Sequence, residues 1–200
     1  MDRAKIQLSA DELHLVTDEQ VILTKNRVIG KMLGFFGLLG NHYRMLAADI
    51  IPPGITQHPK ISRGENYNGL PYVILDYPKH FTKEDIFAIR TMFLWGNGFS
   101  ITLHLKGQYK LLFERVLFEN TALLGQHGWY MQVSGDEWQH HYADATHQPV
   151  AGIAANGLHA LMKDMPFMKL VCYFSLQQWE EAERKFLESF FNMIRAMGFR

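Results

Sequence analysis

The stretch from Phe99 to Lys106 alternates strictly between apolar and polar side chains. The apolar positions are Phe99, Ile101, Leu103 and Leu105, and the polar positions are Ser100, Thr102, His104 and Lys106. An alternation of period two predicts a strand with one buried face and one polar face. Such a strand is typical of an antiparallel or mixed sheet that packs helices on one face and meets water on the other.

Two long amphipathic segments can supply those helices. One begins near Asp18, and the other follows Ser175 and ends at Gly198. Apolar side chains repeat at intervals of three and four, as on one face of a helix, at Ile22, Ile29, Met32, Leu33, Phe36 and Leu39 in the first segment and at Trp179, Ala182, Phe186, Phe190, Ile194 and Met197 in the second.

Four glycines interrupt the first of these helices: Gly30, Gly34, Gly37 and Gly40. Each costs about 1 kcal/mol relative to alanine inside a helix. Their repetition predicts close backbone packing against a neighbouring element. A helix that binds a partner or a membrane surface is the alternative.

Further strands are expected at Tyr72–Tyr77, Trp129–Val133 and Met168–Leu176. A helix is expected after Thr82, where Thr82 and Asp85 fit an N-terminal cap and Gly96 fits the end. Another is expected over residues 108–124, with a hairpin turning at Lys106 and Gly107 as its competitor. Long irregular loops are expected over 50–70 and 138–156.

These elements predict an α+β fold, with a mixed or antiparallel sheet of about four strands packed by long N- and C-terminal helices. A chain of 200 residues suits one domain, spanning 1–200. A doubly wound α/β fold is the alternative, because the linking helices are long enough for parallel crossovers.

Charge and composition restrict the partners. Twenty Lys and Arg balance twenty Asp and Glu, so the chain has no net attraction to nucleic acid. The most apolar run, Met32–Leu39, is far shorter than the roughly 20 residues that span a bilayer, so no membrane association is expected. Cys172 is the only cysteine, and the start of the sequence resembles no secretory signal, so a cytoplasmic location is expected.

Motifs for nucleotide binding or acyl transfer are missing from the sequence. The glycines between Gly30 and Gly40 match neither GxGxxG nor GxxxxGK, and no serine stands in a GxSxG elbow.

The densest group of potential metal ligands consists of His140, His141, Asp144 and His147. Imidazole and carboxylate bind divalent transition metals such as zinc, iron or nickel. On a helix, His140, Asp144 and His147 would share one face, although Pro149 and Gly152 favour a loop. A metal-dependent enzyme that activates water at this loop is therefore one functional hypothesis.

The leading hypothesis is a ligand- or protein-binding domain without assignable catalysis. In it, the two long loops meet over the polar sheet face at His104 and bring His58 and Trp138 around a small-molecule ligand. Separately, Asp76 and Arg90 are expected to form a structural ion pair. A third hypothesis is a homo-oligomer formed through the glycine-bearing first helix.

Overall fold

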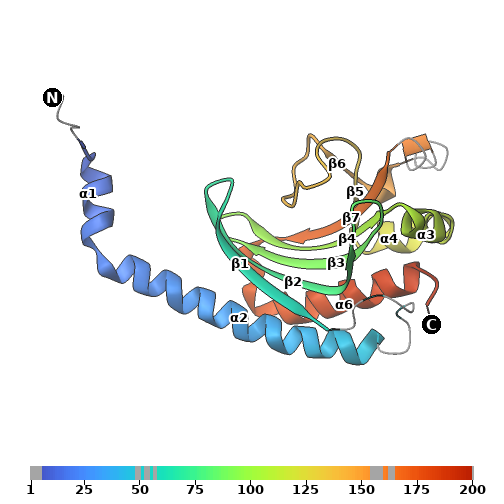
Figure 1. Ribbon diagram of the computed structural model, residues 1–200, viewed down its shortest axis with the longest axis horizontal. Coiled ribbons are helices and arrows are strands. Elements are labelled where there is room, and N and C mark those ends of the chain that lie inside the picture. Colours follow the sequence, from blue (N-terminus) through green and yellow to red (C-terminus); the bar gives the residue numbers. More distant parts are fainter. Residues whose placement is uncertain are drawn as a thin grey trace.

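One antiparallel sheet organises the residues that the computed structural model describes, which are 6–47, 51, 55, 58–153, 160–161 and 165–199 (Figure 1). Seven described strands follow the order β1-β2-β3-β4-β7-β5-β6. They are β1 (Lys60–Tyr67), β2 (Leu70–Phe81), β3 (Ile86–Leu94), β4 (Gly98–Lys106), β5 (Tyr130–Gln132), β6 (His147–Pro149) and β7 (Phe167–Phe174). Every pairing among them is antiparallel, so the doubly wound alternative, which needs parallel strands, is wrong.

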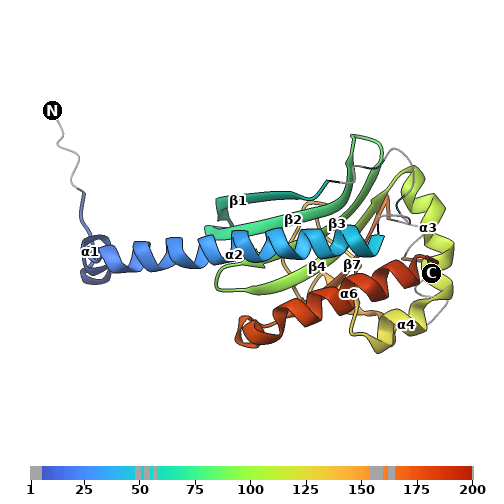
Figure 2. The same ribbon diagram turned by 90° about the horizontal axis from the view of Figure 1, so that it is seen from below.

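Two long helices pack side by side against one face of this sheet (Figures 1 and 2). They are α2 (Glu19–Ala47) near the N-terminus and α6 (Ala182–Ala196) near the C-terminus, which confirms the predicted α+β class. Their contact includes the rings of Tyr43 and Phe190, which stack with centroids 3.9 Å apart. The remaining described helices are α1 (Ala10–Thr17), α3 (Gln108–Glu119), α4 (Thr121–Gln126) and the 3-10 helices η1 (Val150–Gly152) and η2 (Leu176–Glu181).

The main core lies between the sheet and these two helices. All four apolar residues of the alternating segment in β4 are fully buried there, as predicted. The apolar stripe of α2 faces them through Ile29, Met32, Phe36 and Leu39, while α6 contributes Phe186 and Phe190. Burying large apolar side chains of this kind stabilises a fold by about 1.5–3 kcal/mol each.

The predicted helix after Thr82 is instead the strand β3. The backbone N–H of Asp85 does donate to Thr82 Oγ1, at 2.9 Å, but this bond closes the turn between β2 and β3. Asp85 then accepts from the backbone N–H of Gln108, at 2.8 Å, where α3 begins. Gly96, with φ +68°, turns β3 into β4 rather than ending a helix.

The strand count was also underestimated, because two expected loops contain strands. Within the predicted loop 50–70, residues 60–67 form the edge strand β1, which pairs with β2. Within the predicted loop 138–156, residues 147–149 form β6, which pairs with β5. Both strands consist mainly of polar residues and lack an alternation of apolar and polar side chains, so the sequence pattern does not indicate them as strands.

The polar face of β4 is largely shielded from water, which the alternation does not predict but a loop over His104 does. Ser100, Thr102 and His104 are all buried, because the chain between β5 and β6 folds over this face. Among the described residues, no helix has both the length and the apolar character needed to cross a membrane.

The glycines of α2 are packed less closely than predicted. A Cβ at Gly30, Gly34 or Gly37 would meet no atom within 4 Å, so these three glycines lie on an open side of the helix. Only at Gly40 would a Cβ touch another element, with Pro59 Cβ 2.9 Å away. Close packing therefore explains one of the four glycines.

This contrast predicts opposite effects of two alanine substitutions on the free energy of unfolding, measured by urea denaturation. Gly37→Ala should stabilise the protein by up to ~1 kcal/mol, because alanine is the better helix former and its methyl group has open space. Gly40→Ala should destabilise it by ~1–3 kcal/mol through overpacking against Pro59. Equal effects of the two substitutions would contradict this description of α2.

Candidate functional site: a buried polar network beneath a loop

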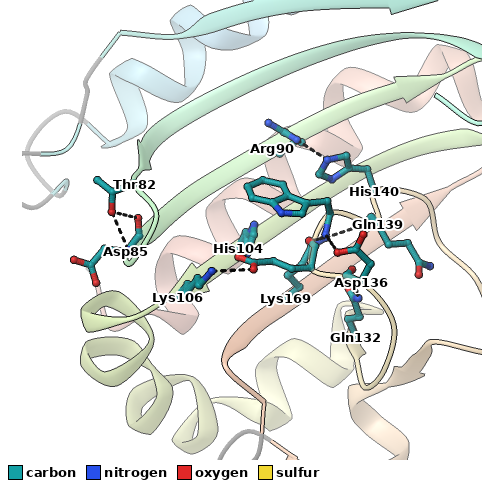
Figure 3. A network of polar contacts seen from close by, with 12 residues as sticks. Thr82, Asp85, Arg90, His104, Lys106, Gln132, Asp136, Gln139, His140 and Lys169 are labelled. Atoms are coloured by element: carbon teal, nitrogen blue, oxygen red, sulfur yellow. Dashed lines mark hydrogen bonds and ion pairs between the residues drawn. The ribbon is translucent and has the colours of Figure 1, made fainter. Parts of the chain in front are cut away.

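Strand pairing gathers charged and polar side chains on the sheet face opposite α2 and α6. Asp76 of β2 is the register partner of Arg90 of β3, and His104 of β4 is the partner of Lys169 of β7. Since side chains alternate along strands, these four residues project from the same face of neighbouring strands. The loop between β5 and β6, residues 133–146, covers Arg90, His104 and Lys169 (Figure 3).

Arg90 is the centre of one half of this network. Its guanidinium binds the Asp76 carboxylate with two hydrogen bonds, of 2.7 and 2.9 Å, which confirms the predicted ion pair. A further guanidinium nitrogen lies 2.9 Å from Nε2 of His140 in the loop. Because arginine can only donate, that imidazole nitrogen accepts. Burial, and then the charge of Arg90, lower the pKa of His140 to about 2, so this histidine is neutral at pH 7.

Lys169 fastens the loop from the other half. It is 3% exposed and donates to two backbone carbonyl oxygens of the loop, that of Glu137 at 3.0 Å and that of Gln139. Burial and the nearby Arg90 lower the pKa of Lys169 to about 8, while Glu137 and Asp136 act in the opposite direction. The ammonium is thus mostly protonated at pH 7, with loop oxygens replacing water around it.

Glu137 descends from the loop between two residues of β4. Lys106 Nζ donates to its Oε2 at 3.0 Å, and His104 Nε2 lies 3.2 Å from its Oε1. His104 Nε2 and Glu137 Oε1 make no hydrogen bond within the described structure, so their close approach is a poorly aligned contact. Burial and three neighbouring cations, Lys169, Arg90 and Lys106, lower the pKa of His104 to about 3, and a neutral imidazole gains little from the carboxylate charge.

The loop is also held by hydrogen bonds of its own. The fully buried Gln132 of β5 donates to the backbone oxygens of Ser134 and Asp136, at 3.0 and 2.9 Å. Tyr67 of β1 accepts from the backbone N–H of His140 at 2.7 Å, and its hydroxyl lies 2.9 Å from His141 Nδ1. Strands from both sides of the sheet therefore fix the loop.

The predicted ligand-binding residues are brought together only in part. The rings of His104 and Trp138 lie 5.8 Å apart, and Trp138 is 49% exposed at the outer edge of the network. His58 is exposed at the start of β1, next to Pro59, which packs against Gly40 of α2 on the opposite side of the sheet. A small-molecule ligand at His104 and Trp138 stays a prediction.

The proposed metal ligands each have a different partner. His140 contacts Arg90 and His141 contacts Tyr67, whereas the exposed Asp144 accepts from the Tyr142 hydroxyl at 2.6 Å. His147 Nδ1 lies 3.0 Å from Thr146 Oγ1, and burial lowers the pKa of this histidine. Within the described ranges, no three His, Cys, Asp or Glu side chains are placed to hold a metal ion.

Sequence reasoning missed Glu137, Lys169 and Tyr67. Lys169 carried a usable signal, since it is a lone charge in the apolar run Phe167–Phe174 and its buried position demands oxygen partners. Comparisons of the chain with protein-family models, with curated proteins and with solved structures found no match. By its geometry, the network holds the loop 133–146 against the sheet through Arg90 and Lys169.

Two neutral histidines, the buried His104 and the half-buried His140, predict a loss of stability in acid. Both have folded-state pKa values of about 3 or lower, whereas an unfolded histidine titrates near 6.5. Below pH 6.5 the unfolded state binds protons that the folded state refuses, so the free energy of unfolding falls as the pH falls toward 3. At pH 5 the loss is ~2 kcal/mol for His104 alone.

Urea denaturation at pH 7.5 and at pH 5 measures this loss. The His104→Gln variant should show a smaller difference between the two pH values than the natural chain. His58→Gln, which changes an exposed residue just before β1, should leave the difference as it is. Equal stability of the natural chain at both pH values would contradict this, because it would mean that the folded protein protonates these histidines at pH 5 as readily as the unfolded chain.

The metal hypothesis has a separate test, elemental analysis of protein purified without a histidine tag. Because His140, His141, Asp144 and His147 bind different partners, we expect metal well below one equivalent and no rise in melting temperature with zinc, nickel, manganese or iron. A stoichiometric metal content would restore the hypothesis of a metal-dependent enzyme.

Proposed function

We propose that this protein is a protein-binding domain that associates with a second copy of itself through its N-terminal arm. We define the arm as residues 6–24, comprising α1 and the first turns of α2 (Figure 1). The single observation that carries the proposal is a dense set of apolar side chains left in water on this arm.

Eight large apolar residues of the arm are between 41% and 88% exposed: Ile6, Leu8, Leu13, Leu15, Val16, Val21, Ile22 and Leu23. No residue of the arm is buried. α2 projects beyond the sheet here (Figure 2). Lys25, one residue after the arm, forms an ion pair with Glu65 of β1. Contiguous exposed apolar surface of this kind typically marks a protein interaction site.

Charge along this region favours a second copy laid antiparallel. All acidic residues of 6–47 lie between Asp11 and Glu19, whereas every Lys and Arg lies between Lys25 and Arg44. A parallel pair of arms would set acid beside acid. An antiparallel pair sets the acidic part of each copy beside the basic part of the other.

One face of α2 has a self-complementary order of residues. Glu19, Leu23 and Arg27 follow at intervals of four, so they share a face, and all three are exposed. In an antiparallel pair related by a two-fold axis near Leu23, Glu19 of each copy meets Arg27 of the other, and the two leucines meet each other. The neighbouring Gly30 lies on the same open side and permits close approach of the second helix.

The location expected from the sequence belongs to this proposal. Cys172 is a free thiol, as a reducing compartment such as the cytoplasm would keep it.

The test is sedimentation equilibrium at tens of micromolar protein. The natural chain should sediment at twice its monomer mass of 23.2 kDa. Glu19→Arg and Arg27→Glu should each raise the dissociation constant of the dimer about tenfold, because two attractive pairs become repulsive. An equimolar mixture of the two variants should recover the natural affinity, since opposite charges then meet at both pairs.

A matched control is Glu119→Arg, which reverses an exposed charge on α3 and should leave the dimer unchanged. A natural chain that stays monomeric, or variants that fail to complement each other in the mixture, would overturn the antiparallel association. A monomer that binds lipid vesicles through the arm would assign the apolar surface to a membrane instead.

A further inference from the structure

A polar groove lies where the sheet edge meets α6. Its volume is about 330 Å³, within the usual size of small-molecule sites. β7 forms one wall, α6 the second, and the turn between α4 and β5 the third. The residues that line it are His127, Gly128, Tyr130, Cys172, Tyr173, Phe174, Lys185, Glu188, Ser189 and Asn192.

The β7 wall is an open strand edge. β7 pairs with β4 along its whole length, but it pairs with β5 only at Leu170 and Val171. Within the described chain, residues 172–174 therefore have a strand partner on one side only. Backbone groups on the other side are available to a ligand in the groove.

Two buried polar side chains face this groove from α6. Asn192 is 8% exposed, and its amide has no hydrogen-bond partner among the described residues. Ser189 is equally buried, and its hydroxyl donates to the sulfur of Cys172 at 3.6 Å. The Asn192 amide can therefore donate its N–H groups to a ligand in the groove.

The groove also holds a cation without a counter-ion. Lys185 Nζ lies 5.7 Å from the centre of the Phe174 ring, and no carboxylate of the described residues forms an ion pair with it. Glu188 does not compensate it, because both of its oxygens accept from Arg184 at 2.9 Å. The side chains thus offer an ammonium and an amide as donors, beside a hydroxyl that donates to Cys172.

We propose that this groove binds a small molecule through a carboxylate group, held by Lys185 and Asn192 beside Ser189 and Cys172. An ionised acceptor is the natural complement of several donors and one free cation. The site lies on α6 and β7, away from the N-terminal arm, so its failure would leave the proposed self-association untouched.

Cys172 gives a direct test, because it is the only cysteine of the chain and therefore the only thiol that a reagent can alkylate. Iodoacetate and iodoacetamide have similar size and differ in the carboxylate. In both reactions the thiolate of Cys172 forms a C–S bond, the C–I bond breaks, iodide leaves, and the thiol proton passes to the buffer. Mass spectrometry of the Cys172 peptide gives the two rates.

The measured quantity is the ratio of the iodoacetate rate to the iodoacetamide rate. In the folded protein it should exceed the ratio for the same chain unfolded in urea by about tenfold, as one charge-assisted contact implies. Lys185→Met should return the ratio toward the unfolded value. Lys83→Met, at an exposed position between β2 and β3, should not change it.

Several outcomes would overturn the proposal. A folded ratio equal to or below the unfolded ratio would show that the groove has no preference for a carboxylate. Absence of alkylation by both reagents would show that the groove does not admit even a two-carbon molecule. An unchanged ratio in Lys185→Met, with circular dichroism confirming the fold, would remove the role of the ammonium.

Discussion

An ammonium group enclosed on a sheet face needs oxygen atoms around it, since removing it from water without partners costs several kcal/mol. Lys169 finds them in the backbone carbonyls of Glu137 and Gln139, which belong to the loop and not to the sheet. The loop must therefore lie where it does for β7 to keep this lysine inside. Arg90, which holds both Asp76 and His140, imposes the same requirement from β3.

The two faces of the sheet are covered in physically different ways. On one face, α2 and α6 exclude water with apolar side chains, a contact that many residue combinations can satisfy. On the other face, each hydrogen bond needs a particular donor and acceptor at a defined place, so the cover is specific to one loop conformation. The first face supplies most of the stability, and the second determines where residues 133–146 lie.

The sequence was most informative where one face of an element is apolar and the other polar. The alternation at Phe99–Lys106 predicted β4, and the intervals of three and four after Gln178 predicted α6. The same approach failed for Ile86–Leu94, because a strand covered on both faces has no alternation to reveal it. Thr82 and Asp85 also favoured a helix wrongly. A hydroxyl that accepts from the backbone N–H three residues later occurs in turns as well as at helix N-termini.

The network was predictable in outline only. The polar residues of β4 indicated where a cover would lie, and Trp138 and His140 do belong to that cover. What the sequence could not provide was the arrangement across strands that sets His104 opposite Lys169 and brings Tyr67 to His141 over 74 positions of the chain. The contacts of loop residues such as Glu137 depend on the strands beneath them, such as the one that carries Lys106. The local sequence around Glu137 does not indicate those contacts.

The length of α2 has a consequence for how its ends behave. A helical segment without tertiary contacts is marginal in water, because the first turn is costly to nucleate. In α2 the buried half, around Met32 and Phe36, nucleates the helix, and the helix propagates from there into the projecting half. Helicity should then decline gradually toward Glu19, while α1 starts independently from the reciprocal cap of Ser9 and Glu12. In a copy without its partner, the projecting half should therefore fray, with amide protons that exchange faster with each turn away from the core.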